Sequence, residues 1–189
     1  YAYRIKQGVA LPFVDIRIVD EQGGEQPWDG KTAGNAELRG PWVTGAYHKN
    51  EGADDKFSKD GWLKTGDVCQ IDEEGYVKLT DRTKDLVKSG GEWISSVDLE
   101  NAIMGHPDVL EAAVIAVAHP KWDERPLAVV VVKEGKVVTT SEIRNFLEGQ
   151  FAKIWLPDAV EMIDEIPKTS TGKFMKLALR EQYKDWVWD

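Results

Sequence analysis

The sequence has 189 residues, of which 42% are hydrophobic and 30% are charged, an ordinary balance for a globular protein. Its formal net charge of −9 at pH 7 argues against non-specific nucleic-acid binding, which needs clustered positive charge to displace counterions. Its single cysteine, Cys69, excludes an internal disulfide framework and is typical of a reducing compartment, so we expect a cytoplasmic protein. No apolar run approaches the roughly 20 residues that a membrane-spanning helix needs.

The first eighty residues are predicted to form short β-strands. Residues 14–18 alternate apolar and charged side chains, as a half-buried strand does, and residues 36–40 predict a second strand. Residues 68–80 predict a hairpin around a turn that contains glycine. These strands are too few and too short for an independent core, and the first residue is not Met. We therefore expect this region to belong to a larger domain that begins upstream.

Two pairs of residues farther along the chain mark the expected starts of helices. Ser95 and Asp98 stand at the spacing of a capping box, and Thr139 and Glu142 repeat that spacing. In a capping box the first side chain accepts a hydrogen bond from the backbone three residues later, which satisfies one of the free N–H groups of the first turn. We expect a helix after each pair, and a last helix near the C-terminus with Leu179 on its apolar side.

The segments between these helices are predicted to form buried strands. Residues 112–118 and 127–132 are apolar runs rich in valine, which is typical of strands buried on both faces, and residues 160–163 predict a further short strand. Strands mixed with helices over about 105 residues indicate a compact α+β domain. We therefore predict an α+β fold in three parts: a β-rich region at residues 1–81, a hinge at residues 82–85, and a small α+β domain at residues 86–189.

Asp67, Arg82, Lys84 and Lys88 are the first candidate binding residues. Asp67 follows a Thr-Gly turn, where a carboxylate can accept hydrogen bonds from two neighbouring ribose hydroxyls. Taken alone, the tripeptide fits a turn aspartate bonded to its own backbone at least as well. The forked donors of Arg82 suit a phosphate or a ribose oxygen, but also a surface salt bridge. Lys84 and Lys88 add positive charge nearby, which could contact a ligand or could simply form a solvated polar face.

Two glycine-containing stretches could serve chemistry. Gly90 and Gly91, followed by Glu92, let the backbone approach a ligand without a Cβ clash, so the stretch can line a narrow channel or simply form a hairpin turn. Residues 169–173 place Lys173 on a small polar loop, from which a cation can reach a developing negative charge or remain a solvent-exposed lysine. That loop is not a Walker motif, because the first glycine at the required spacing is absent. The three histidines stand singly, so we predict no metal site.

Four motifs, in this order, resemble the C-terminal part of the adenylate-forming enzymes, which include the acyl-CoA synthetases, the adenylation domains of peptide synthetases, and the luciferases. The resemblance covers nearly the whole chain. Trp93 after Gly-Gly-Glu, and Lys84 at a position where the wider family has Asp, are most similar to the fatty acyl-CoA synthetase branch. The motifs are G-W-L-K-T-G-D at 61–67, D-R-T-K-D-L-V-K-S-G-G-E-W-I-S at 81–95, H-P-D-V-L-E-A-A-V at 106–114, and P-K-T-S-T-G-K at 167–173.

The resemblance implies a ligase that works in two steps. A medium- or long-chain fatty acid attacks the α-phosphate of ATP and gives an acyl adenylate and pyrophosphate, after which the thiol of CoA displaces AMP. The C-terminal domain is expected to rotate between the steps. Residues 1–81 would be the end of a truncated N-terminal adenylation domain, with the Mg²⁺ ligand in its missing part. We expect this chain alone to be inactive.

The resemblance also assigns roles to individual residues. Lys173 would be catalytic, because it stabilises the charge that develops in adenylation, and Lys84 would be the hinge residue. Among the nucleotide-binding positions, Asp67 would hold the ribose hydroxyls, Arg82 would contact the ribose or a phosphate, and Lys88 and Trp93 would meet the adenylate. The residues expected to line the channel for the pantetheine arm of CoA are Gly90, Gly91 and Glu92.

Two other interpretations remain open from the sequence. The chain could belong to an adenylating enzyme with another acceptor, such as the thiol of a carrier protein, or it could be a non-catalytic domain that docks on a partner or regulates it. For the leading interpretation the expected partners are fatty acid, ATP and CoA, with no nucleic acid and no transmembrane segment. An oligomer is compatible with the sequence, and the acyl chain length would be set by a pocket outside it.

Overall fold

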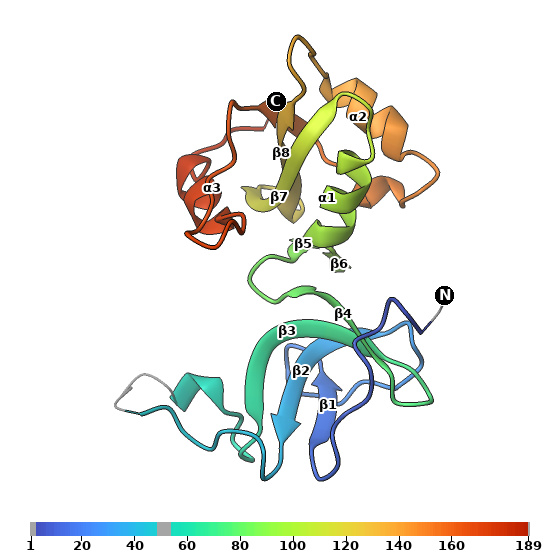
Figure 1. Cartoon of the computed structure of the whole chain (residues 1–189), viewed down its shortest axis with the longest axis vertical. Coiled ribbons are helices and arrows are strands. Elements are labelled where there is room, and N and C mark those ends of the chain that lie inside the picture. The colour runs from blue at the N-terminus through green and yellow to red at the C-terminus, as the bar shows by residue number, and fades with distance from the viewer. Residues whose placement is uncertain (1–2, 49–53, 189) are drawn as a thin grey trace. The chain divides into compact units, whose positions relative to one another are not determined.

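The computed structural model shown in Figure 1 describes residues 3–48 and 54–188. The chain divides into two compact units, Tyr1–Lys84 and Asp85–Asp189. Among the described residues, no helix is long and apolar enough to cross a membrane.

The first unit is built on a four-stranded antiparallel sheet in the order β1-β2-β3-β4. The predicted hairpin is β3 and β4, but β3 begins five residues earlier than expected, because Leu63 and Lys64 also pair with β2. The core of the sheet is small and consists of Ile18, Ala36, Cys69 and Ile71, all buried. The elements are β1 (Asp15–Val19), β2 (Ala33–Arg39), a short 3-10 helix η1 (Asp54–Lys56), β3 (Leu63–Ile71) and β4 (Val77–Arg82).

The second unit combines a five-stranded sheet with three α-helices, which confirms the predicted α+β fold. The strand order is β6-β5-β8-β7; β9 lies parallel to β8, and the other pairs are antiparallel. The elements are β5 (Val87–Ser89), β6 (Glu92–Ile94), α1 (Ser96–Met104), β7 (Val109–His119), β8 (Asp123–Val132), α2 (Thr140–Leu147), a 3-10 helix η2 (Lys153–Trp155), β9 (Ala159–Met162) and α3 (Lys176–Gln182).

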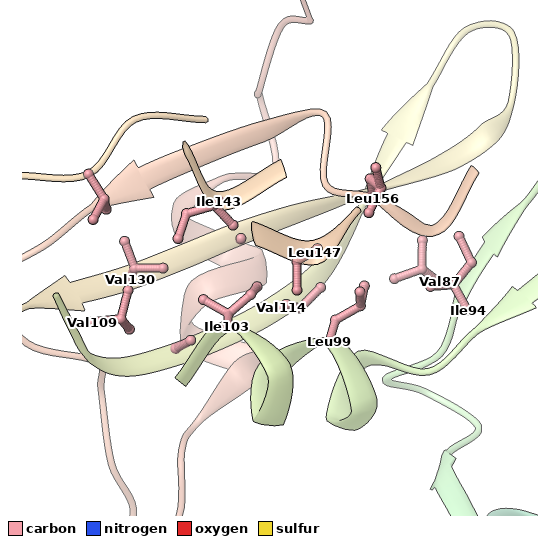
Figure 2. Close-up of a cluster of buried hydrophobic side chains, with 13 residues drawn as sticks. Val87, Ile94, Leu99, Ile103, Val109, Val114, Val130, Ile143, Leu147 and Leu156 are labelled. Carbon is pink, nitrogen blue, oxygen red and sulfur yellow. The ribbon is translucent and has the colours of Figure 1, made fainter. Parts of the chain in front are cut away.

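Strands β7 and β8 are buried on both faces, as their valine-rich runs predicted. Side chains alternate along each strand, so one set packs under α1 and α2 and the other packs toward α3. Figure 1 shows α1 and α2 on one side of these strands and α3 on the other. In Figure 2, side chains from α1, α2 and the strands point into one cluster that includes Leu99, Ile103, Val114, Val130, Ile143 and Leu147.

Both predicted capping motifs begin a helix. The Ser95 hydroxyl accepts a hydrogen bond from the Asp98 backbone N–H at 3.1 Å, directly before α1. Before α2, Thr139 and Glu142 form a complete capping box, in which each side chain accepts a hydrogen bond from the backbone of the other. Each cap satisfies one of the free N–H groups of the first turn, which helps to explain why the helices start where the sequence predicts.

Candidate functional site

Asp67 and Arg82, two of the predicted nucleotide-binding residues, face each other in the first unit. They are register partners on β3 and β4, and Arg82 Nε lies 3.0 Å from Asp67 Oδ1. The Arg82 side chain is 61% exposed and the Asp67 side chain 30%. Because an exposed ion pair contributes little to stability, both groups can turn toward a ligand at small energetic cost.

The backbone before Asp67 is fixed by its own turn. Gly66 has a φ of 76°, in the left-handed region that glycine adopts readily, and its carbonyl accepts a hydrogen bond from the Thr83 N–H at 3.0 Å. The Thr65 hydroxyl accepts from the Asp67 N–H at 3.0 Å and donates to the Ala36 carbonyl at 3.1 Å. The threonine thus satisfies the turn, and the Asp67 carboxylate stays available to Arg82.

A cavity of about 740 Å³ lies beside this turn and is lined by Thr65, Gly66 and Thr83, together with charged residues of β1, β2 and the segment after η1. Its size would suit a small molecule. Neither Asp67 nor Arg82 lines it, so the cavity by itself identifies no ligand.

One hairpin of the second unit brings together five of the predicted site residues. Strands β5 and β6 pair with Lys88 opposite Trp93, and Gly90 and Gly91 form the two-residue turn between them, followed by Glu92. Gly90 has a φ of 58° and Gly91 a φ of 86°, and two positive φ angles in succession are what a type I′ hairpin turn requires. Because Lys88 and Trp93 are cross-strand partners, their side chains lie on the same face of the hairpin.

The two glycines of this turn have different surroundings. A Cβ atom added at Gly90 would lie 3.0 Å from the Trp122 ring and 3.5 Å from Ile154, so a side chain there meets packed neighbours. The Gly90 N–H also donates to the Trp122 carbonyl at 3.0 Å. Among the described residues, a Cβ at Gly91 would meet no atom within 4 Å. A side chain at position 90 would therefore press on packed neighbours, whereas a side chain at position 91 would enter space that the described residues leave open.

The loop that carries Lys173 is a closed turn. An isolated β-bridge joins Lys168 to Phe174, the Thr169 N–H donates to the Lys173 carbonyl at 2.8 Å, and the Lys173 N–H donates to the Thr169 hydroxyl at 3.2 Å. Gly172, with a φ of 80°, allows the chain to reverse. The backbone at Lys173 is thus defined by local hydrogen bonds.

Lys173 differs from the two lysines that flank its loop. Lys168 Nζ lies 2.6 Å from a carboxylate oxygen of Glu111, and Lys176 Nζ lies 2.6 Å from one of Glu100. The exposed Lys173 ammonium has no such hydrogen bond or ion pair within the described part of the second unit. It is therefore the cation of this segment that is available to a ligand.

Lys84, the predicted hinge residue, is exposed and is the last residue of the first unit. The next residue, Asp85, accepts a hydrogen bond from Arg180 of α3 at 2.7 Å. The chain is therefore anchored to the second unit directly after Lys84. The hinge role of Lys84 stays a prediction.

Sequence reasoning missed Arg125, a buried arginine at the start of β8 that is only 3% exposed. The available signal was an arginine followed directly by an apolar run, where a charge is costly unless it is paired. Its partners lie about 30 residues away along the chain, so the sequence pattern could not identify them.

Cys69 carries no nucleophilic chemistry in this fold. It is fully buried in the sheet of the first unit, and burial raises the pKa of its thiol to about 11. A reactive cysteine needs its thiolate form near neutral pH, which this environment disfavours. The prediction that Cys69 fills space in a strand agrees with this environment.

Comparison with known proteins identifies the family. Residues 98–173 match the family described as AMP-binding enzyme C-terminal domain. A long-chain-fatty-acid–CoA ligase from Thermus thermophilus is 55% identical over 97% of this chain and 34% of its own length. A 3-methylmercaptopropionyl-CoA ligase from Ruegeria lacuscaerulensis is 47% identical over 92% of this chain and 32% of its own length.

A solved structure also resembles almost the whole chain. The crystal structure of ATP-bound MatB from Rhodopseudomonas palustris matches with a TM-score of 0.82 and 38% identity, over 96% of this chain and 36% of that one. Residues 98–173, within the second unit, are an AMP-binding enzyme C-terminal domain, and almost the whole chain is similar to CoA ligases that are about three times as long. The chain spans about a third of the length of the curated relatives it matches.

Proposed function

We propose that the full-length protein is an AMP-forming ligase that joins a medium- or long-chain fatty acid to CoA. The observation that carries the proposal is the similarity of almost the whole chain to the Thermus long-chain-fatty-acid–CoA ligase. The second relative is named for a short thioether acid, so the acyl chain is the least supported part of the proposal. The acceptor is CoA because both relatives are named as CoA ligases.

Lys173 acts in the first step. When the fatty-acid carboxylate attacks the α-phosphate of ATP, negative charge accumulates on the oxygens around phosphorus. A cation placed near those oxygens lowers the barrier, and it does so more effectively in a site that excludes water. The Lys173 ammonium can take this role because no carboxylate in the described part of its unit, residues 85–188, pairs with it.

Asp67 and Arg82 hold the nucleotide in this proposal. The Asp67 carboxylate accepts from the two ribose hydroxyls, and Arg82, its neighbour on β4, contacts the ribose or a phosphate oxygen. Lys88 and Trp93, which share one face of the β5–β6 hairpin, contact the adenylate. Lys84 is the hinge residue whose backbone rotation changes the face that the second unit presents in each step.

The β5–β6 turn acts in the second step. The CoA thiol sits at the end of the slender pantetheine arm, which needs a narrow passage to the acyl adenylate. Gly90 and Gly91 carry no side chain to obstruct such a passage, and Glu92 follows at its edge. The open space beside Gly91 supports this assignment.

The Mg²⁺ of this chemistry is assigned to the rest of the polypeptide. Within residues 3–48 and 54–188, no group of three or more His, Cys, Asp or Glu side chains is arranged to hold a metal ion. This chain's own contribution is therefore to bind the nucleotide, to supply the Lys173 charge, and to form the channel. A cytoplasmic location and a possible oligomer remain predictions.

The test is acid-dependent exchange of labelled pyrophosphate into ATP by the full-length protein, with carboxylic acids from short thioether acids to long fatty acids. Exchange that is highest with medium or long fatty acids, followed by acyl-CoA formation when CoA is added, is the expected result. Exchange without acyl-CoA formation would favour a carrier-protein acceptor. Folded protein that binds ATP but exchanges with no acid would contradict adenylation and favour a docking domain.

A further inference from the structure

Arg125 joins the Gly90–Gly91 turn to a second segment of its unit. Its guanidinium donates five hydrogen bonds, and each acceptor lies outside β8. The acceptors are the Ser89 hydroxyl at 2.9 Å, the Ile154 carbonyl at 2.5 Å, the Leu156 carbonyl at 3.1 Å, and the two Asp158 carboxylate oxygens at 2.5 and 3.1 Å.

Two of these contacts lie next to Gly90. Ser89, the residue before Gly90, is completely buried and bonds to Arg125. Ile154, whose side chain would meet a Cβ at Gly90, has its carbonyl bonded to the same Arg125 nitrogen. Arg125 therefore determines the position of the turn and of one of the two residues that it packs against.

The chemistry of a buried guanidinium makes this arrangement specific. A buried charge is tolerated only when its donors are satisfied, and the planar fork of arginine satisfies several acceptors at fixed angles. The hairpin and the 154–158 segment can therefore take few relative positions while all five bonds remain. A lysine has no fork and three donors around one atom, so it cannot reproduce this set.

We propose that Arg125 is a positioning residue for the thioester-forming step: through Ser89 and Ile154 it fixes the Gly90–Gly91 turn in the place where the pantetheine arm passes. This inference rests on the proposed function, because the turn matters to catalysis only if it lines the channel. Arg125 itself touches no reacting atom.

Arg144 provides a matched control. Its guanidinium donates to the same Asp158 carboxylate at 3.1 Å and to the Pro157 carbonyl at 2.6 Å. Its acceptors all lie in the 154–158 segment, and none belongs to the β5–β6 hairpin. Arg144→Lys therefore disturbs the shared carboxylate and leaves the bond to Ser89 in place.

The experiment compares Arg125→Lys, Ser89→Ala and Arg144→Lys in the full-length enzyme, with pyrophosphate exchange for the first step and CoA-dependent turnover of preformed acyl adenylate for the second. Arg125→Lys is expected to slow the second step about tenfold or more, since small misplacements of positioned groups have large rate effects. Ser89→Ala removes a single hydrogen bond to a charged group, and it is expected to lower the rate of the second step about threefold or more. Arg125→Lys and Ser89→Ala should both keep the rate of pyrophosphate exchange within about twofold of wild type. The control Arg144→Lys should keep the rates of both steps within about twofold of wild type.

The outcomes separate the two proposals. If Arg125→Lys slows both steps equally, or no more than Arg144→Lys does, Arg125 has no positioning role. If Arg125→Lys does not fold, Ser89→Ala decides alone, and a second step unchanged from wild type would overturn the inference. Wild-type enzyme that forms adenylate but no acyl-CoA would contradict the proposed function itself.

Discussion

The turn at Gly90 and Gly91 is tied to its surroundings by Arg125, Trp122 and Glu124, whereas the loop at residues 168–174 is closed largely by its own backbone. The first is a turn whose neighbours leave little room at Gly90. The second presents an exposed lysine that has no partner within the described part of its unit. Both belong to one small α+β unit, yet they are stabilised by different means.

The difference corresponds to the two tasks that we propose. A channel for a flexible thiol arm needs walls in fixed positions, because a displaced wall either closes the passage or misaligns the thiol. A cation that stabilises one transition state needs an unpaired charge, because a neighbouring carboxylate would neutralise it. If the second unit serves both steps, changes in these two loops should therefore affect different steps.

Lys173→Ala should have the largest effect. Removing the ammonium should lower adenylation by about 100- to 1,000-fold, the range measured when one stabilising group is removed from an active site. The thioester step from preformed acyl adenylate should stay within a few-fold of wild type. Lys184→Ala, which removes an exposed lysine from the same unit, should leave both steps unchanged. Equal losses in both steps for Lys173→Ala would contradict the division of labour.

Gly91→Leu should have the reverse effect. A leucine at Gly91 enters the open space beside the turn and should slow the CoA-dependent step by about tenfold or more through obstruction of the channel. Gly149→Leu is the matched control, because Gly149 also has a positive φ, of 81°, and open space among the described residues. It introduces the same backbone strain elsewhere. Unchanged CoA-dependent turnover in Gly91→Leu would remove Gly91 from the channel.

Leu99→Ala tests the core beneath the hairpin. Leu99 is fully buried in the cluster that includes Val87 and Ile94 of β5 and β6. Its truncation should lower the free energy of unfolding by about 3 kcal/mol, since it leaves a cavity in a packed core. Val97→Ala, at a 39% exposed position on the same helix, should change it by less than about 0.5 kcal/mol. Hydrogen exchange of α1 amides in the full-length protein would measure both, and similar values would show that Leu99 is not a core residue.

Asp158→Asn should destabilise the protein by an amount that depends on pH, because it removes the carboxylate that pairs with the buried Arg125. Burial alone would raise the pKa of Asp158, but the hydrogen bonds and charges of Arg125 and Arg144 outweigh burial and hold the pKa below its ordinary value. The ionised Asp158 carboxylate therefore contributes its stability above about pH 4, the pKa of an aspartate in the unfolded chain. That stability is lost as the pH falls through the lower pKa of Asp158 in the folded state. The stability gap between wild type and Asp158→Asn should close over that range. A gap that stays constant down to about pH 2 would contradict this assignment.

Local sequence patterns predicted the helices and buried strands well, because their causes are local. The caps at Ser95 and Thr139 and the valine-rich runs of β7 and β8 depend on neighbouring residues, and the structure confirms them. The start of β8 was missed, because Asp123 and Arg125 are polar and interrupt the apolar pattern. These residues belong to the strand because they pair with β7 in the folded sheet.

The sequence predicted which residues make up the candidate site, but not the distant contacts that hold them in place. The motifs supplied Lys173 and the Gly90–Gly91 turn. The cross-strand pairing of Asp67 with Arg82 lies beyond the predicted hairpin and depends on a register shift between Val68 and Cys69, which the sequence pattern did not signal. The contacts that fix the turn come from Arg125 and Trp122, far along the chain, and no local periodicity signals them. The roles assigned to these residues remain predictions until each step is measured.

The most direct measurement is a crossed one: Lys173→Ala and Gly91→Leu, each assayed in the full-length enzyme for pyrophosphate exchange and for CoA-dependent turnover of preformed acyl adenylate. We predict that Lys173→Ala loses the first activity and keeps the second, and that Gly91→Leu keeps the first and loses much of the second. Parallel losses in both variants would show that one small unit does not divide the two steps between these loops.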